Sequence, residues 1–498
     1  MEILYRSTRG GEERITASQA ILNGIAGNGG LYVPTEIPAF DRPVRAFASM
    51  DYRETAFTIL KAFLTDYTEE ELRSCINSAY GSQFDTAQIA PLTEAAGVHY
   101  LELYHGPTIA FKDMALQLLP HLMTTAAKKN GVTDEIVILT ATSGDTGKAA
   151  LEGFTDVQGT RIVVFYPKHG VSRIQELQMV TQKGDNTCVV GIEGNFDDAQ
   201  TGVKKLFTDE RVGAALAANG FRFSSANSIN IGRLVPQIVY YVYSYARLLR
   251  EGRIADGEAV NIVVPTGNFG NILAAWYAKK MGLPVKKLIC ASNENKVLYD
   301  FFGTGTYDRN REFILTSSPS MDILISSNLE RLIYHIAGDD AETDRALMAK
   351  LLSEGKYEIT DTMRKALTDF VGGFATEEET KAEIARVFTD AHYLIDTHTA
   401  VASAVCDRYR RDSGDTAQTI LASTASPFKF TRAVTAALGI ADGDADDFAL
   451  AEKLSEKTGV PVPAAVSSLP GAQIRHTRVC EVTEMEQAVR DFLGIKGT

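Results

Sequence analysis

The stretch Val263–Trp276 reads Val-Val-Pro-Thr-Gly-Asn-Phe-Gly-Asn-Ile-Leu-Ala-Ala-Trp and carries the pattern that decides the fold. A β-branched run leads into a glycine-rich loop, and a helix-forming run follows at once. Apolar strands that alternate with helices form parallel sheets whose two faces are covered by those helices. The stretch therefore predicts an α/β protein, with this loop at the carboxyl end of a strand.

The same pattern recurs on both sides of this stretch. Short runs rich in Val and Ile end in Gly, Ser or Thr, and they predict strands at Glu135–Thr140, Arg161–Tyr166, Thr187–Ile192, Asn261–Pro265 and Thr419–Ala422. Residues 1 to about 95 are predicted to be mainly helical, with a capping box at Thr68-x-x-Glu71. Residues from about 299 to 390 carry dense charge and a second capping box, Thr376-x-x-Glu379. We interpret them as a helical insertion that covers an α/β domain and carries no chemistry.

The composition argues against several other classes of protein. The chain has 498 residues, 45% of them hydrophobic, and a formal charge of −13, which disfavours binding to nucleic acid or anionic membranes. No apolar run approaches the ~20 residues of a membrane span, and the first residues show no signal core. The five cysteines lack Cys-x-x-Cys spacing and the eight histidines lack metal-ligand spacing. We expect a cytoplasmic protein with reduced cysteines and no metal.

One lysine stands out for its surroundings. Lys112 ends the run His105-Gly-Pro-Thr-Ile-Ala-Phe-Lys112 and is followed, after one residue, by the apolar run Met114–Leu119. We expect it at the start of a helix, where burial lowers the pKa of its amine and makes the amine available for imine chemistry. The alternative is a lysine that extends from a helix end into water.

A glycine-rich loop also follows the strand predicted at Glu135–Thr140. It spans Thr142–Gly147 and reads Thr-Ser-Gly-Asp-Thr-Gly. Hydroxyls and free amides at the start of the next helix can bind a carboxylate or a phosphate. Asp145 is unexpected in such a site, because it repels a carboxylate unless it points away or caps the helix. A loop that only caps the helix is the alternative.

The loop at Gly267–Asn271 is neither a Walker loop nor Gly-x-Gly-x-x-Gly, which disfavours ATP and dinucleotides. A phosphate monoester held by backbone amides and the helix dipole fits better, and a turn without a ligand is the alternative.

A third motif, Ser423–Phe430, ends a predicted strand with hydroxyls that can form a hydrogen bond to a heterocycle. Reactive lysine, phosphate loop and strand-end hydroxyl together indicate pyridoxal 5′-phosphate.

Taken together, these motifs match those of a known enzyme family. The chain resembles the threonine synthase family of the bacterial and fungal type, a group of fold-type II pyridoxal-phosphate enzymes. The matching runs stand in family order over nearly the whole chain: Tyr5–Gly11, Gly29–Pro34, His105–Asp113, Thr142–Gly147, Asn227–Arg233, Gly267–Asn271 and Ser423–Pro427. Many relatives have His at Ser426, Ala at Phe428 and Pro at Thr397. These departures bear on substrate positioning more than on cofactor binding.

The resemblance implies a fold like the tryptophan synthase β subunit, with two open, parallel α/β domains. We expect a mainly helical segment over 1–95, a smaller α/β domain over 96–235, and a larger one over 236–498 that includes the insertion. The resemblance also implies that Lys112 forms the Schiff base and that Thr424 faces the pyridine nitrogen. The implied phosphate-binding residues are Gly267, Asn268, Phe269, Gly270 and Asn271.

The implied reaction converts O-phospho-L-homoserine and water to L-threonine and phosphate, with Lys112 as the general base. Candidates for binding the substrate carboxylate are Thr142, Ser143, Asp145 and Thr146. Candidates for binding the departing phosphate are Ser172, Arg173, Asn227, Arg233 and Lys429. His398 either orients the substrate or is a satisfied structural histidine.

Three alternatives compete with this function. A serine or threonine dehydratase is disfavoured, because the match extends through the N-terminal segment and not only the cofactor motifs. A phospho-lyase on the same scaffold would act on O-phosphohomoserine or O-phosphothreonine with the same cofactor residues and would yield 2-oxobutyrate. A catalytically inactive regulator would keep the fold, although the presence of Lys112 and an intact glycine loop argues against it. The charge is compatible with a monomer, and a homodimer is the other possible state.

Overall fold

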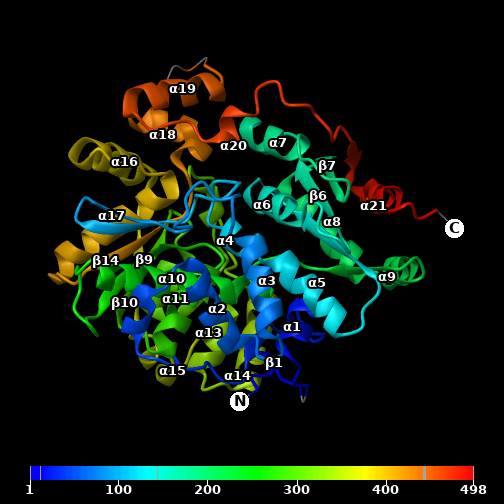
Figure 1. The fold of residues 1–498 in the computed structure, drawn as a ribbon, viewed down its shortest axis with the longest axis horizontal. Coiled ribbons are helices and arrows are strands. Elements are labelled where there is room, and N and C mark those ends of the chain that lie inside the picture. The colour runs from blue at the N-terminus through cyan, green and yellow to red at the C-terminus, as the bar shows by residue number, and fades with distance from the viewer. Residues whose placement is uncertain (1, 12, 143, 441–442, 444, 497–498) are drawn as a thin grey trace.

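Two sheets of mainly parallel strands organise the molecule, and Figure 1 shows them side by side. The computed structural model describes residues 2–11, 13–142, 144–440, 443 and 445–496. The five-stranded sheet has the order β15-β7-β6-β5-β8, and all its neighbouring pairs run parallel. Its strands are β5 (Glu135–Ala141), β6 (Thr160–Pro167), β7 (Thr187–Glu193), β8 (Phe221–Ser224) and β15 (Val479–Glu481).

The six-stranded sheet has the order β13-β10-β9-β14-β4-β3. Its edge strand β3 runs antiparallel to β4, and the other neighbours run parallel. Its strands are β3 (Leu92–Ala95), β4 (Val98–Glu102), β9 (Val260–Pro265), β10 (Val285–Ser292), β13 (Phe370–Phe374) and β14 (Thr419–Ser423). Two short antiparallel pairs lie outside both sheets: β1 (Tyr5–Ser7) with β2 (Tyr32–Pro34), and β11 (Thr306–Asp308) with β12 (Lys356–Glu358).

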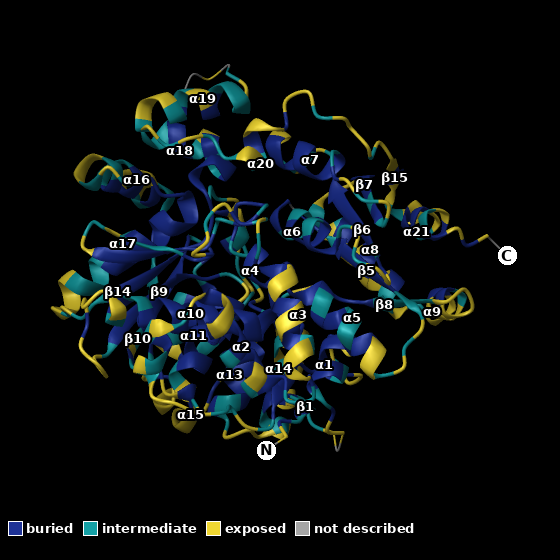
Figure 2. Ribbon diagram, in the orientation of Figure 1, coloured by how far each residue is buried: buried dark blue, intermediate teal, exposed yellow. Residues whose placement is uncertain are grey.

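Helices surround the sheets, and Figure 2 shows the strands and central helices buried while the outer helices expose one face. The α-helices of the first half are α1 (Ala17–Asn23), α2 (Tyr52–Phe63), α3 (Glu69–Ala79), α4 (Asp113–Leu116), α5 (Leu119–Lys129), α6 (Asp145–Phe154), α7 (Arg173–Val180), α8 (Phe196–Thr208), α9 (Glu210–Ala217) and α10 (Ile231–Arg250). Those of the second half are α11 (Gly270–Met281), α12 (Val297–Thr304), α13 (Leu329–Ile336), α14 (Ala341–Glu354), α15 (Asp361–Lys365), α16 (Glu377–Ala391), α17 (Thr397–Ser413), α18 (Thr431–Ala437), α19 (Asp447–Thr458), α20 (Ala464–Ser467) and α21 (Met485–Leu493). Short 3-10 helices are η1 (Val44–Ser49), η2 (Pro319–Met321), η3 (Pro427–Phe430) and η4 (Val482–Glu484).

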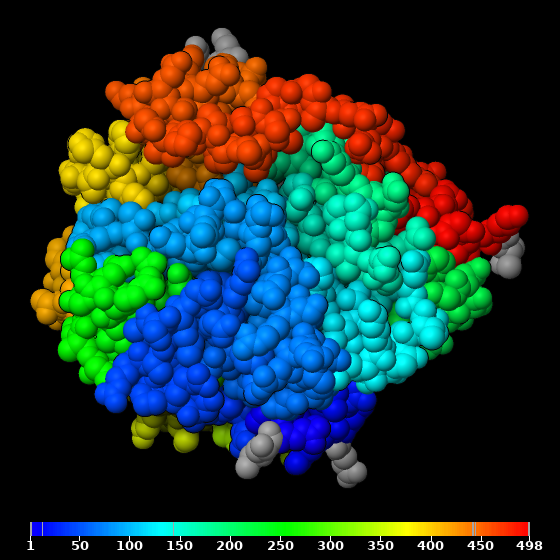
Figure 3. Space-filling view, viewed as in Figure 1, coloured from blue at the N-terminus to red at the C-terminus, as the bar shows by residue number. Residues whose placement is uncertain are grey.

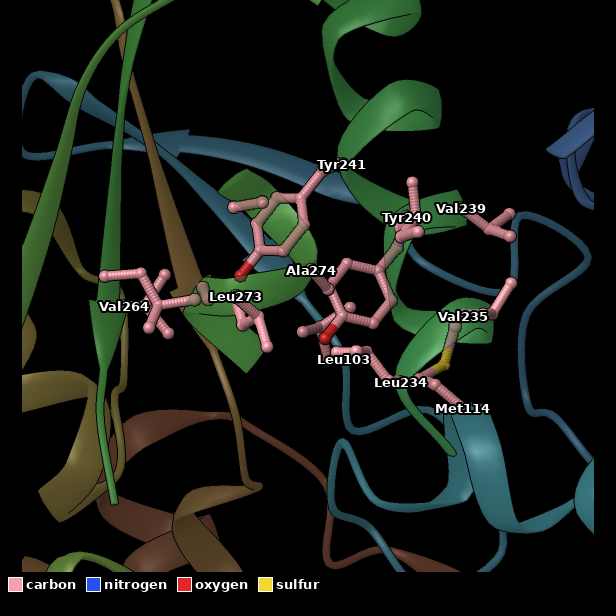
Figure 4. Packing of buried hydrophobic residues seen from close by; sticks show 14 of the residues in the cluster. Leu103, Met114, Leu234, Val235, Val239, Tyr240, Tyr241, Val264, Leu273 and Ala274 are labelled. Atoms are coloured by element: carbon pink, nitrogen blue, oxygen red, sulfur yellow. The ribbon is translucent and has the colours of Figure 1, made fainter. Parts of the chain in front are cut away.

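The long helix α10 is the centre of the larger core. It is buried almost all round, because it packs against α2, α4 and α11 together. Figure 4 shows Leu234, Val235 and Tyr240 of this helix packed against Leu103 and Met114. Burial of this kind stabilises by about 1.5–3 kcal/mol per large apolar side chain. The core thus fixes α10 against α4, which begins one residue after Lys112.

None of the helices in the described ranges is long and apolar enough to cross a membrane.

The strands and capping boxes predicted from the sequence are confirmed. The five predicted strands correspond to β5, β6, β7, β9 and β14 within a residue or two. Thr68 and Thr376 each accept a hydrogen bond from the backbone three residues on, and the glutamate there returns one. The five cysteines are free thiols.

The sheets do not follow the expected boundaries at 95/96 and 235/236. Strand β4 follows the first boundary but pairs with β14 in the six-stranded sheet. Strand β15 pairs with β7, and α21 packs on the same five-stranded sheet. Figure 3 shows this C-terminal segment, in orange to red, running along the outer rim of the molecule. A buried strand joins whichever sheet offers a free edge and a matching apolar face, and neither is visible in the local sequence.

The segment 299–390 also differs from the expected helical cover. It contains β11, β12 and the sheet strand β13 as well as helices. Strand β13 is the edge of the six-stranded sheet, parallel to β10. Its Gly372 and Gly373 lie where a Cβ would meet Phe302 at 3.2 Å and Val405 at 2.4 Å, respectively. Close packing in this glycine-containing strand explains why it lacks the apolar run that would have predicted it.

Candidate active site

Lys112 lies immediately before α4, on a loop that is rigidly held. Its neighbour Asp113 is buried and accepts hydrogen bonds from the Thr108 backbone N–H at 2.8 Å and the Thr108 hydroxyl at 2.6 Å. Burial raises the pKa of Asp113 to about 6, although the Thr108 bonds oppose this rise. A Cβ at Gly106 would lie 2.5 Å from the Asp113 carboxylate, so only glycine permits this close turn. These contacts fix the position from which the lysine side chain extends.

The Lys112 amine has little access to water and lies among the polar side chains of Asp145, Ser320 and Lys429, a group called the lysine cleft below. The side chain is 11% exposed, and Nζ donates to Ser320 Oγ at 3.1 Å and lies 3.7 Å from Asp145 Oδ2. Burial lowers the pKa of Lys112 below its ordinary value, and the nearby charges of Lys429 and Arg233 add to this effect while Asp145 opposes it. The expectation of a desolvated lysine at a helix start is therefore confirmed.

Asp145 begins α6 and turns into the same cleft. Its Oδ1 lies 3.3 Å from Lys429 Nζ and accepts from Gln175 Nε2 at 3.2 Å, while Oδ2 accepts from the Ser320 hydroxyl at 2.9 Å. Burial alone would raise the pKa of Asp145, but the charges of Lys429 and Lys112 hold it well below its usual range. Asp145 is thus an ionised counter-charge to two lysines.

Ser320 reaches the lysine cleft from residues 299–390, which were expected to form a helical cover without chemistry. Its backbone N–H donates to His398 Nε2 at 3.1 Å, and His398 Nδ1 lies 2.8 Å from Asp396 Oδ2. An Nε2 that accepts requires the proton on Nδ1, where Asp396 accepts it. His398 is therefore a satisfied structural histidine that holds the Ser320 turn. The local sequence indicates only a turn here, through Ser-Ser-Pro-Ser at 317–320, and not that Ser320 belongs to the site.

The loop after β5 is held by a threonine. Thr142 is buried, and its hydroxyl accepts from the Gly144 N–H at 3.0 Å and the Gly147 N–H at 2.9 Å. Its acceptor capacity is therefore used inside the loop. Thr146 is half-buried in the first turn of α6. Ser143 lies outside the described residues.

The loop between β9 and α11 has the features of a phosphate cradle. Phe269 has φ of 65°, a left-handed conformation that is unusual for a bulky residue and typical of functional turns. A Cβ at Gly267 would lie 2.4 Å from the Ser320 carbonyl oxygen. The Asn328 N–H donates to the Asn268 carbonyl at 3.0 Å. The segment around 320–328 therefore packs directly on this loop.

Asn271 supplies the test of whether the loop fits a phosphate. Its Oδ1 accepts from the hydroxyls of Tyr240 and Tyr241 at 2.6 and 2.5 Å, which orients Nδ2 away from them. That Nδ2 is buried and has no partner. A buried donor without a partner at the start of a twelve-residue helix fits the phosphate of pyridoxal phosphate. Tyr240 and Tyr241 were not predicted, because they lie on α10 among other apolar positions.

Thr424 lies at the end of β14, beside the lysine loop. It is buried, and its carbonyl accepts from the Phe111 N–H at 2.8 Å. Lys429, a few residues on, is fully buried and donates to the Thr108 carbonyl at 3.0 Å. The structure therefore brings this motif against the loop that carries Lys112.

The candidates for the substrate phosphate lie in different surroundings. Arg233 is buried, donates to the Ala226 carbonyl at 3.0 Å and has an unpartnered Nε; burial lowers its pKa to about 10. Ser172 is an exposed helix cap, and exposed Arg173 pairs with Glu176 at 2.9 Å. Asn227 is exposed. Like Lys429, the fifth candidate, Arg233 also acts electrostatically on Lys112.

Comparison with known proteins agrees with this geometry. Residues 4–80 match the threonine synthase N terminus, residues 87–424 the pyridoxal-phosphate dependent enzymes, and residues 399–492 the threonine synthase C-terminal region. Threonine synthase from Schizosaccharomyces pombe is 36% identical over 88% of this chain and 90% of its own length. Threonine synthase-like 1 from Homo sapiens is 41% identical over 86% of this chain, which spans 59% of that relative's length.

A solved structure shows the same fold throughout. The pyridoxal-phosphate-bound threonine synthase from Brucella melitensis superposes with a TM-score of 0.88 at 36% identity, over 99% of each chain. The similarity therefore extends over both sheets and the segments that form the cleft. The chain belongs to the threonine synthase family of pyridoxal-phosphate-dependent enzymes.

Proposed function

We propose that this protein is a threonine synthase, a carbon–oxygen lyase that converts O-phospho-L-homoserine and water to L-threonine and phosphate. The observation that carries the proposal is a buried amine, Lys112, next to a buried cation, Arg233, which has no acid partner among the described residues. A buried unpaired cation is costly and points to an anionic ligand. Family membership supplies the reaction type.

The cofactor of this family is pyridoxal phosphate, which when bound supplies an aldehyde for amines and a ring that withdraws electrons from the neighbouring carbon. We assign its phosphate to the Gly267–Asn271 loop and its covalent attachment to Lys112. Support comes from the unpartnered Asn271 Nδ2 and the free amides at the start of α11. We place Thr424 beside the ring nitrogen, because its strand end packs on the lysine loop.

Lys112 is the base and acid of the reaction. Burial keeps its amine closer to the neutral form than in water, so Nζ takes a proton from the substrate α-carbon and later returns one. The cleft excludes water from most of this side chain, which strengthens each charge interaction inside it.

We assign the substrate's anionic groups to donors around this amine. Arg233 binds the departing phosphate, with the exposed residues Ser172, Arg173 and Asn227 as further candidates. The loop with Ser143 and Thr146 binds the carboxylate. Gln175 joins the start of α7, where Ser172 and Arg173 lie, to Asp145 at the start of α6.

The test is phosphate release from O-phospho-L-homoserine by cofactor-loaded protein, with the product identified in the same sample. Equal amounts of phosphate and threonine establish the synthase. Phosphate with 2-oxobutyrate identifies the phospho-lyase. No phosphate, from protein with normally bound cofactor, would refute the substrate assignment.

A second arm tests Arg233. Arg233→Met should raise KM about 100-fold, since truncation of a buried charged partner costs roughly 2–5 kcal/mol. Arg233→Lys, the matched control, should keep part of the affinity because it keeps the charge. An unchanged KM in Arg233→Met would exclude Arg233 as a phosphate ligand.

We further propose that the protein works in the cytoplasm as a monomer. The five free cysteines support a reducing compartment. Light scattering of the loaded protein measures its mass, and a mass twice that of the chain would show the homodimer instead.

A further inference from the structure

We propose that the Lys429–Asp145 ion pair, joined to Lys112 through the Ser320 hydroxyl, is a positioning device for the Lys112 amine. The inference rests on the proposed function, since it assigns this task to residues around the proposed base. It gives Asp145 and Lys429 a role other than binding substrate. Ser320 and His398 become positioning residues that belong to the same device.

Asp145 has no oxygen left for a substrate group. One oxygen faces Lys429 and Gln175, and the other accepts from Ser320 and faces Lys112. An ionised carboxylate in this position repels a substrate carboxylate. Its geometry instead suits a fixed counter-charge beside an amine that must alternate between neutral and protonated forms.

Ser320 makes the connection to Lys112 directional. Its hydroxyl donates to Asp145, so a lone pair on the same oxygen is free to accept from Lys112. The backbone of Ser320 is fixed by His398 on one side and by the close approach to Gly267 on the other. The hydroxyl therefore presents an acceptor at a constant place whenever the amine is released.

Lys429 keeps this arrangement from trapping the amine. Without it, Asp145 would hold Lys112 as a buried ammonium, which cannot take a proton. Lys429 is fully buried and neutralises Asp145 from the opposite side, and its own charge disfavours a proton on Lys112. The pair thus holds the amine in place while leaving it free to lose its proton.

The first experiment measures attachment of pyridoxal phosphate to cofactor-free protein, followed by the absorbance of the lysine-bound cofactor over a range of pH. Only the neutral amine attacks an aldehyde, so the attachment rate depends on both the orientation and the protonation state of the Lys112 amine. Ser320→Ala should slow attachment about tenfold, as expected for loss of one hydrogen bond to an ionisable group, the Lys112 amine. Ser320→Thr, which retains the hydroxyl, should restore most of the rate.

Ser317→Ala is the matched control in the same turn. Ser317 bonds through its backbone, whose N–H donates to Glu377 and whose carbonyl accepts from Thr397. Its attachment rate should equal that of the unmodified protein. If Ser320→Ala attaches as fast as Ser317→Ala, the positioning role of Ser320 is overturned.

The charge pair is tested by variants that move the pH profile in opposite directions. Asp145→Asn removes a charge that favours the protonated amine, so the profile should move to lower pH. Lys429→Met removes a charge that disfavours it and leaves Asp145 unneutralised, so the profile should move to higher pH. Circular dichroism confirms that each variant is folded. Shifts in the same direction, or no shift in either folded variant, would contradict the proposal.

These readouts separate the inference from the proposed function. Cofactor attachment needs no substrate, so a wrong substrate assignment leaves the attachment results unchanged. If Ser320→Ala slows attachment and no threonine forms in any variant, the device stands and the synthase proposal fails. If threonine forms normally in Ser320→Ala, with an unchanged attachment rate, the device fails and the synthase proposal stands.

Discussion

The cofactor loop and the lysine cleft are built in opposite ways. The loop is one contiguous run, Gly267–Asn271, between a strand and a helix. The cleft is assembled from segments far apart in the chain, which contribute Lys112, Asp145, Ser320 and Lys429. The loop supplies its amides from one run of the chain, with Tyr240 and Tyr241 orienting Asn271 from outside it. Control of a proton requires charges from several directions. Loss of a single residue should therefore have different consequences in the two regions.

The largest effect is expected in the cleft. Lys112→Ala removes both the attachment point and the base, so threonine formation should fall by at least about a thousandfold. Borohydride reduction followed by mass spectrometry measures covalent attachment. Lys128→Ala, on the exposed end of α5, is the control and should attach cofactor normally. Cofactor covalently attached to Lys112→Ala protein would show that another residue is the attachment point, and the contrast between loop and cleft would fail.

The loop should respond next most strongly. In Gly267→Ala the new Cβ would lie 2.4 Å from the Ser320 carbonyl, so the loop and the Ser320 turn must separate. At a cost of about 1–3 kcal/mol, cofactor affinity should fall roughly tenfold to a hundredfold in equilibrium titrations. Gly213→Ala, where a Cβ would meet no atom within 4 Å, should bind cofactor unchanged. Equal affinities in the two variants would show that the close approach is unimportant.

A smaller effect is expected from the support of the loop. Asn271→Ala removes the buried donor and leaves the Tyr240 and Tyr241 hydroxyls without their acceptor. Cofactor affinity should fall about tenfold, and Tm of the cofactor-free protein should also fall, because unsatisfied buried groups cost about 1–3 kcal/mol. A lower Tm with unchanged affinity would mean that Asn271 supports the tyrosines only.

The smallest effect on activity is expected at Asp344, a buried acid on which the charges of Glu330 and Arg9 act. Both oxygens of Asp344 are buried and unpartnered; burial, followed by the charge of Glu330, raises its pKa from 3.8 to about 9 despite Arg9. The folded protein holds a proton there that the unfolded chain releases. Stability should therefore fall as pH rises from about 4 to 9, by at most about 1.4 kcal/mol per unit.

Asp344→Asn should remove this part of the pH dependence without changing activity. Thermal unfolding at pH 6 and pH 8 measures the difference. Exposed Asp412→Asn is the control and should behave as the unmodified protein. The same pH slope in Asp344→Asn would disprove the raised pKa and weaken the contrast with Asp145, whose charge is maintained by two lysines.

Much of the fold was predictable because its signals are local. The apolar runs of β5, β6, β7, β9 and β14 mark buried strands by composition alone. Thr68 and Thr376 mark helix starts because a capping box needs only four consecutive residues. Strand β13 escaped prediction, since its glycines pack closely instead of providing apolar bulk.

The sequence by itself determined which residues are chemically suited to the site: a lysine before an apolar helix, a glycine loop after a strand, and hydroxyls at a strand end. Only the tertiary structure decided that Asp145 faces two lysines, that Ser320 joins Asp145 to Lys112, and that β15 returns to the five-stranded sheet. The physical reason is range. Capping and turn formation act over a few residues, whereas charge, burial and strand pairing depend on every segment that packs nearby, at any distance along the chain.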